Sequence, residues 1–235
     1  KIGKNPRSKD LFKGNRLDLL ALIPKKTSRG YRIFVNPFKK KDKDWLRIWY
    51  SHSRGSGKQI ELKRFIEIKT LGTLLGQYQA EGTKHQKSQR KFSVEFKNKL
   101  IKEHREFLDS LFDMGLSRDL INFYFGFNPE KLSKKQIKEE IRKFQSQINY
   151  PVRLSPSKKC KGSAFGLIIR NVLLTEIILF SLDKIRIFLA NQNKYSLEKK
   201  ELVNCFFAKL LTGDGTLDSR CNTRKFPHLQ IKIVD

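Results

Sequence analysis

Two similar stretches occur in the sequence, LLGQYQAEG (residues 74–82) and FAKLLTGDG (residues 207–215). Both run from apolar residues to a small residue, an acid and a glycine, with the acids at Glu81 and Asp214. Glycine after the last turn is typical of a helix C-terminus, because it tolerates the backbone angles that end a helix. We therefore interpret both stretches as the C-terminal ends of two related helices.

Hydrophobic spacing predicts a longer helix in front of each ending. Apolar residues recur at helical spacing over residues 71–78, and Ser196 is suited to cap a helix over residues 197–212. Two helices can pack closely only where their side chains are small. The residues suited to such a close approach are Gly76, Ala80, Ala208 and Gly213.

The two acids are the unusual feature of these endings. A carboxylate at a helix C-terminus faces the negative end of the helix dipole, which costs about 0.3–1 kcal/mol, and two neighbouring carboxylates repel each other. A divalent cation between Glu81 and Asp214 would remove both penalties, and Mg²⁺ prefers carboxylate, water and phosphate oxygens. An acid before a glycine is also a common turn pair. Two matched acids in a strongly basic chain nevertheless favour a metal site over two ordinary turns. Such a metal site is able to cleave a phosphodiester.

Composition limits the class of protein. The 235 residues carry 50 Lys and Arg against 23 Asp and Glu, a formal charge of +27, which predicts a polyanionic partner. Eighteen phenylalanines indicate a folded chain and not a disordered basic tail. Three cysteines without a C-x-x-C pair support neither a disulfide framework nor a zinc finger. No secretion signal or apolar run of the roughly 18 residues needed to span a bilayer is present, so we expect an intracellular protein.

Working outward from the motifs, periodicity predicts further elements. A short helix is expected over residues 17–23, strands over 31–35, 45–50 and 59–68, and a basic loop over 151–162. From residue 70 the expected order is α-β-α-β-α-β-α-α-β, with helices over 99–114, 134–148 and 173–190 and strands over 92–96, 121–127, 164–169 and 226–234. The opening α-β recurs at the second motif, which indicates an α+β fold built on a duplicated unit.

These residues resemble the two motifs of LAGLIDADG homing endonucleases, in the single-chain, two-motif form. The second stretch departs from the motif at its third position, where Lys209 replaces a small residue. The resemblance implies two αββαββα halves related by a pseudo-twofold axis, with curved antiparallel sheets that form a DNA-binding saddle. It covers a first half over residues 70–195 and the start of a second over 196–235, while residues 1–69 form a β-rich basic segment without a counterpart.

The resemblance also implies an activity, which is Mg²⁺-dependent cleavage of double-stranded DNA by an intron-encoded enzyme. Glu81 and Asp214 match the metal-binding acid of each motif. Basic residues near the family's site position water or stabilise charge, and Lys84, Lys97 and Lys232 are the candidates for this role.

Clustered basic residues supply candidate DNA contacts through phosphate binding and, for Arg and Gln, through base edges. Charge runs are also commonly solvated surface. The candidates are Lys84, Lys87, Gln89, Arg90, Lys91, Lys158, Lys159, Lys161, Arg220, Arg224 and Lys225. The segment around Trp45, Arg47, Trp49 and Tyr50 is suited to stack on bases, although ordinary burial favours a buried sheet face.

Two other functions remain open at this stage. One is a degenerate relative that binds DNA or intron RNA without cutting, which Lys209 favours; the other is a ribosome- or RNA-associated basic protein. Only 20 residues follow Gly215, which are residues 216–235. We therefore expect either a truncated sequence, a second half completed by residues 1–69 as a monomer, or completion by a partner chain.

Overall fold

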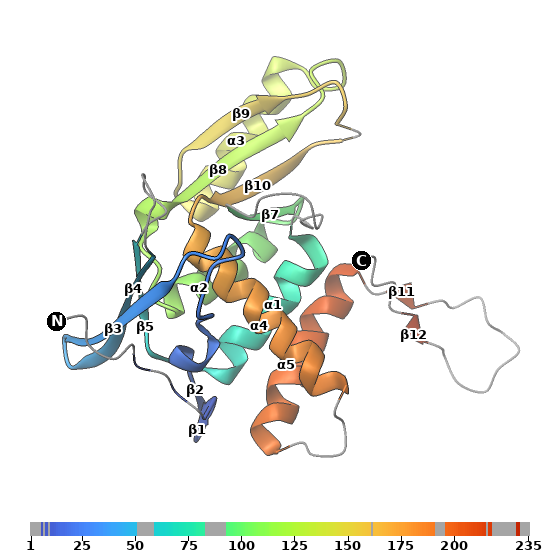
Figure 1. The fold of residues 1–235 in the computed structure, drawn as a ribbon. Helices are drawn as coiled ribbons and strands as arrows, with labels where there is room; N and C mark the ends of the chain where they lie inside the picture. The colour runs from blue at the N-terminus through green and yellow to red at the C-terminus, as the bar shows by residue number, and fades with distance from the viewer. Residues whose placement is uncertain are drawn as a thin grey trace, which may run out of the picture.

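Two long helices that carry the motif stretches lie side by side in the chain's α+β fold (Figure 1). They are α1 (Ile68–Glu81) and α5 (Leu197–Asp214). The computed structural model describes residues 6, 8, 10–50, 59–82, 93–160, 162–190, 196–214, 216–217 and 229–230; for residues 213–214, 216–217 and 229–230 it describes the backbone only. The expected α+β class is confirmed for these residues.

A four-stranded sheet lies above the helix pair in Figure 1, in the order β7-β10-β8-β9. Its strands are β7 (Val94–Asn98), β8 (Ile121–Phe127), β9 (Val152–Pro156) and β10 (Ala164–Ile169). All neighbours are antiparallel except β8 and β9, which are parallel. Since side chains alternate along a strand, one face of this sheet is apolar and the other is polar.

The apolar face packs on α2 (Ile101–Asp113) and α3 (Lys134–Ile148) through stacked aromatic rings. The ring centroids of Phe96 and Phe107 are 4.4 Å apart, and those of Phe144 and Phe165 are 4.0 Å apart. Ser133 and Gln136 form a capping box that begins α3. The many phenylalanines of the sequence are therefore the core of this layer.

The helix α4 (Val172–Ala190) joins the sheet to the N-terminal segment. Asn171 begins the helix, because its Oδ1 accepts the backbone N–H of Leu174 at 3.0 Å. The buried carboxylate of Glu176 accepts the backbone N–H of Ser28 at 2.7 Å. Helix α4 thus fixes a loop that lies almost 150 residues earlier in the chain.

Residues before α1 form two small antiparallel sheets. One contains β1 (Phe12–Lys13), β2 (Arg16–Asp18) and β6 (Phe65–Glu67), and the other contains β3 (Ile33–Lys40), β4 (Lys43–Tyr50) and β5 (Gln59–Lys63). The strands β3–β5 lie on the side of the molecule away from α5 (Figure 1). The backbone N–H of Lys63 donates to the carbonyl of Met114 at 2.8 Å, which ties this sheet to the turn after α2.

An antiparallel pairing follows each motif helix. After α1, Gly82 pairs with Phe96 in an isolated bridge. After α5, β11 (Thr216–Leu217) pairs with β12 (Leu229–Gln230), with Thr216 opposite Gln230. Both pairings join residues fourteen positions apart, from 82 to 96 and from 216 to 230.

The structure corrects several sequence-based expectations. Residues 17–23 are not one helix, because Arg16–Asp18 forms β2 and only Leu19–Leu22 turns, as the short 3-10 helix η1. The expected loop over 151–162 contains β9, which forms by pairing with β8 and has only a weak apolar pattern of its own. Arg118–Leu120 forms a second 3-10 turn, η3. Of the expected strand over 226–234, only Leu229–Gln230 is described. Within the described part of the chain, no helix is long and apolar enough to cross a membrane.

Candidate metal and nucleic-acid site

The motif helices α1 and α5 touch through their backbones. A Cβ atom added to Gly76 would lie 2.3 Å from the carbonyl oxygen of Phe206, and one added to Gly72 would lie 2.6 Å from the Cβ of Cys205. These separations are too short for any side chain at either position. The expected role of Gly76 is confirmed, and Gly72, one turn earlier, was missed although its i, i+4 spacing from Gly76 is visible in the sequence.

The two helices run parallel. Gly72 faces the stretch around Leu202 and Cys205, and Gly76, one turn later, faces Phe206 and Lys209. Because the contacts advance in the same direction along both helices, the C-terminal ends lie at the same end of the pair. Glu81 and Asp214 are the last residues of these helices, so their backbones share that end.

The α5 side of this contact differs from the expectation. Ala208 is exposed and does not line the close approach. Instead, the two glycines of α1 lie against the α5 backbone and the bases of its larger side chains. Because α1 has glycines at the crossing, α5 can approach closely even though its own residues there have larger side chains. Small residues are therefore needed on one of the two helices only.

The glycine that ends α1 has a different purpose from the one expected. Gly82 has φ −73° and ψ 154°, which any residue can adopt. A Cβ there would lie 2.3 Å from the carbonyl oxygen of Tyr78, to which the Gly82 N–H also donates. The chain therefore needs glycine for close contact with the last helical turn, immediately after the carboxylate of Glu81.

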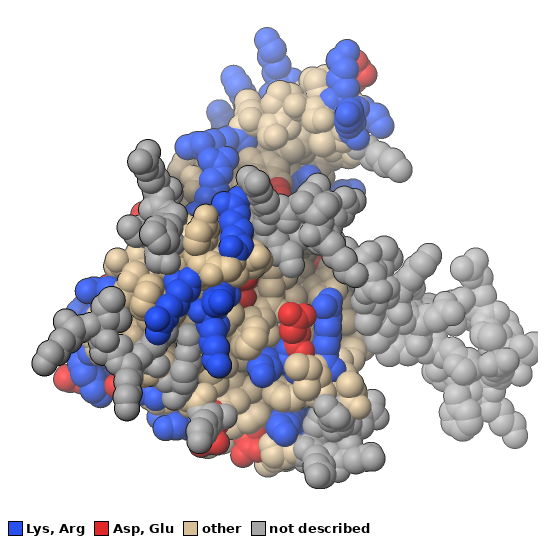
Figure 2. All heavy atoms as spheres, viewed as in Figure 1, with Lys and Arg blue, Asp and Glu red and all other residues tan. Residues whose placement is uncertain are grey.

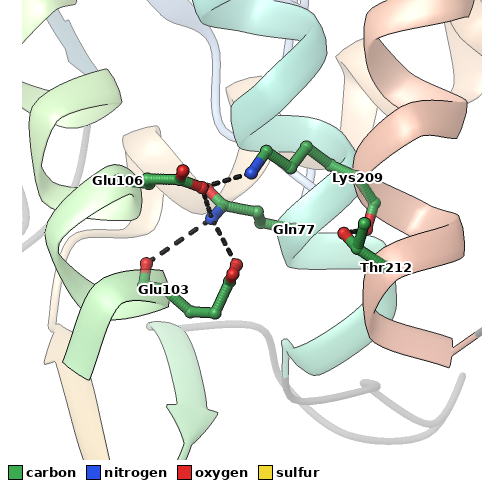
Figure 3. Close-up of polar contacts among 5 residues, drawn as sticks. All are labelled: Gln77, Glu103, Glu106, Lys209 and Thr212. Atoms are coloured by element: carbon green, nitrogen blue, oxygen red, sulfur yellow. Dashed lines mark hydrogen bonds and ion pairs between the residues drawn. The ribbon is translucent and has the colours of Figure 1, made fainter. Parts of the chain in front are cut away.

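A polar cluster joins α1, α5 and α2 beside this helix pair (Figure 3). Lys209 forms an ion pair with Glu106, and the side-chain amide of Gln77 donates to Glu103 Oε2 at 3.0 Å and to Glu106 Oε2 at 3.3 Å. Gln77 is 2% exposed, and Lys209 and Glu106 are both largely buried. The cluster explains how a lysine is tolerated at the third motif position: its Cβ faces Gly76, and its ammonium group reaches a carboxylate of α2.

The polar face of the four-stranded sheet carries the second part of the candidate site. Lys97, Gly166, Tyr124 and Arg153 form one cross-strand row, with Glu95 in the next. The Tyr124 ring occupies the space above Gly166, since a Cβ there would lie 2.2 Å from it. The Tyr124 hydroxyl donates to Glu95, and Lys97 Nζ lies 5.8 Å from the ring centroid.

Burial, and then the contact with Glu95, raise the pKa of the Tyr124 phenol above its usual value, so the hydroxyl stays a donor. A hollow of about 510 Å³ lies over this row. Its polar lining also includes Asn122, Ser155 and Arg170. Figure 2, viewed from the side on which strands β8–β10 lie in front of α3, shows Lys and Arg gathered around this region.

The structure describes only some of the site residues expected from the sequence. Lys97 lies exposed on the polar sheet face. Lys158 and Lys159 are exposed beyond the end of β9, and Lys158 is paired with Glu130 at 2.9 Å. The side chain of Asp214 lies outside the described residues. So do Lys84, Lys87, Gln89, Arg90, Lys91, Lys161, Arg220, Arg224, Lys225 and Lys232.

Tyr124, Arg153 and Arg170 were missed as site candidates. Strand alternation in residues 121–127 was a sufficient signal for Tyr124. Arg153 could be found only by knowing that β9 pairs with β8, which is a non-local contact. No protein-family model matches the chain, and no curated protein sequence matches it either.

Proposed function

We propose that the chain is a LAGLIDADG-type DNA endonuclease that cleaves double-stranded DNA with a divalent cation. The observation that carries the proposal is the parallel pair of motif helices in backbone contact, which brings the acids Glu81 and Asp214 to one end. The net charge of +27 gives the chain the excess of Lys and Arg that binding to duplex DNA requires.

The repeat around each motif supports a duplicated origin. A pairing of residues fourteen positions apart follows both motif helices, close behind Glu81 and Asp214 respectively. From α1 to α4 the described order is α1-β7-α2-β8-α3-β9-β10-α4. With the Gly82 pairing counted as the first strand, and with α3 and β9 as an insertion between β8 and β10, this order corresponds to αββαββα.

In this proposal the sheet holds DNA and the helix ends hold the metal. Lys97 and Arg153 contact phosphates, while Tyr124 and Asn122 lie where they can reach base edges. The carboxylates of Glu81 and Asp214 are hard oxygen donors that suit Mg²⁺ together with phosphate oxygens and water. When bound, Mg²⁺ supplies positive charge for the leaving oxyanion and for activation of the attacking water.

The test begins by selecting duplexes that the full chain binds from a randomised pool, in chelator and at fixed salt. The selected duplex is then incubated with Mg²⁺ and the wild type, Glu81→Gln or Asp214→Asn. Glu67→Gln is the matched control, because Glu67 is the acid at the N-cap of α1, at the end of the helix opposite to Glu81. We expect cleavage by the wild type and the control, and loss of cleavage with retained binding in each amide variant.

Two results would contradict the proposal. If both amide variants cleave as fast as the wild type, the acids are not the metal site. If the wild type binds the duplex in chelator but does not cleave it when any divalent cation is added, the chain is a DNA-binding protein without nuclease activity. Preference for structured RNA over every duplex would favour the RNA-binding alternative.

A further inference from the structure

The outer face of the sheet β3–β5 is aromatic and basic, although its inner face already supplies the buried core. Ile33, Leu46 and Ile48 of the inner face are fully buried. The opposite face of an antiparallel sheet is normally polar where it meets water. Here it carries half-buried aromatic rings at every fourth position of β3 and of β4, which are Phe34, Phe38, Trp45 and Trp49.

The strand register arranges these rings in rows. Phe34 is opposite Trp49, and Phe38 is opposite Trp45. Between the two aromatic rows lies a polar row in which Arg47 stands between Asn36 and Glu61. Rows two residues apart along a strand are roughly 7 Å apart, so a chain crossing this face meets the rings of Phe34 and Trp49, then a guanidinium group, and then the row of Phe38 and Trp45. The Trp45 ring is partly covered, because it packs against Gly115 in the turn after α2.

Cations lie against the rings of both rows. The Phe34 and Trp49 rings are stacked with centroids 5.7 Å apart, and the Arg32 guanidinium lies 5.2 Å from the Phe34 centroid. The rings of the other aromatic row also have cations beside them. The Arg47 guanidinium lies 5.2 Å from the Phe38 ring centroid, and Lys40 Nζ lies 4.8 Å from the Trp45 ring centroid. Glu61 accepts from Arg47 at 2.9 Å and also forms an ion pair with Lys40 Nζ at 3.5 Å, but arginine has five N–H donors and lysine three, more than this one carboxylate uses.

We propose that this outer face of β3–β5 binds single-stranded DNA, with bases stacked on the rings of Phe34 and Trp49 and phosphates held by Arg47 and Lys40. Flat rings interleaved with cations suit unpaired bases, whose faces are accessible, and not a duplex, whose base faces are already stacked. The positive charge of the face is complementary to the phosphate backbone. The choice of DNA over RNA rests on the proposed function; the rest of the inference does not.

The two tryptophans of the sequence give this surface its own optical signal, because both lie on it. An oligodeoxythymidylate of about 12 nucleotides is titrated into the full chain in chelator, with tryptophan emission and the anisotropy of a label on the DNA measured together. We expect saturable quenching whose midpoint coincides with the rise in anisotropy. Chelator removes any cleavage, so this result is independent of the endonuclease assay.

Variants separate stacking from general charge. Trp49→Ala should weaken binding by about 5- to 150-fold, the range for loss of one stacked base, and Phe34→Ala should weaken it similarly. Phe180→Ala is the matched control, because Phe180 is also half-buried beside a cation, Lys184, but on α4. Circular dichroism of each variant checks that the sheet has folded, and Trp49→Phe, which keeps a ring, should bind within about threefold of the wild type.

Four results would overturn the inference. Binding without tryptophan quenching would put single-stranded DNA on another surface. Equal affinities of Trp49→Ala, Phe180→Ala and the wild type would exclude stacking at this row. Tighter binding of the matching oligoribonucleotide would show that the face binds RNA. If neither oligonucleotide binds, the face contacts another protein instead of a nucleic acid.

Discussion

At the scale of single residues, Lys209 shows how a departure from a motif is accommodated. Its neighbour across the helix contact is Gly76, which has no side chain, and its ammonium group pairs with Glu106 of α2. Sequence alone could not predict this pairing, because the partners are 103 positions apart and neither lies in a pattern that marks the other. The lysine therefore does not by itself argue against a functional helix pair.

The Lys209–Glu106 pair should contribute to stability because both side chains are largely buried. We expect Glu106→Gln and Lys209→Met each to lower the free energy of unfolding by about 1–2 kcal/mol, and the double variant to lose less than the sum of the two. Urea unfolding of the four proteins measures the coupling. The exposed pair Asp183 and Arg186 is the control and should show almost none; equal coupling in both pairs would contradict the assigned burial.

His104 should make stability depend on pH. Burial lowers its pKa below the usual 6.5, opposed in part by the contact of Nε2 with the carbonyl of Asn98. The unfolded chain therefore takes up a proton at a higher pH than the folded chain does. Stability is unaffected by this group at neutral pH and falls as the pH drops through about 6.5.

The check is urea unfolding of the wild type and His104→Gln between about pH 7.5 and pH 5.5. The variant should be less stable overall, because it disturbs the packing against Phe96 and Phe144. Its stability should nevertheless fall less steeply with decreasing pH than that of the wild type. Parallel curves for the two proteins would show that His104 titrates normally in the fold.

At the scale of elements, two glycines determine how closely α1 and α5 pack. The neighbours of a Cβ at Gly76 are the backbone carbonyl group of Phe206 and the Cβ of Lys209, which cannot move without separating the helices. The same reasoning distinguishes this position from Gly126 in β8, where a Cβ would be 3.7 Å from its nearest neighbours, an ordinary contact distance.

Gly76→Ala should therefore destabilise the protein by about 2–3 kcal/mol, whereas Gly126→Ala should change stability by less than about 1 kcal/mol. Thermal or urea unfolding of the two variants gives the comparison. If Gly76→Ala is tolerated as well as Gly126→Ala, the backbone contact between α1 and α5 is wrong.

Helices were easier to predict from this sequence than sheets. The apolar spacing and caps of α1, α2, α3 and α5 are local, and their predicted bounds agree with the structure to within a few residues. The position of β10 between β7 and β8 is not local, and neither is the parallel pairing that creates β9. The candidate site was predictable in the same measure: the positions of Glu81 and Asp214 at two helix ends follow from the sequence, but the polar row of Lys97, Tyr124 and Arg153 needs the strand register.

At the scale of the whole molecule, the chain combines a net charge of +27 with a polar face on the four-stranded sheet, which is the proposed duplex-binding surface. Duplex affinity should fall steeply with salt, because each phosphate contact releases counterions. The double variant Lys97→Gln/Arg153→Gln should bind the selected duplex more weakly, and the slope of log affinity against log salt should become shallower by about 2. Arg186→Gln on α4 should leave the slope unchanged; an equal loss in both proteins would mean that the sheet face is not the duplex surface.

The central claim is that one acid from each motif helix holds a divalent cation, and Mn²⁺ binding tests it most directly. Electron paramagnetic resonance counts the Mn²⁺ bound by the chain with its selected duplex. We predict that Glu81→Gln and Asp214→Asn each lose bound Mn²⁺ that the wild type and Glu67→Gln retain. Undiminished Mn²⁺ binding in both amide variants would contradict the account.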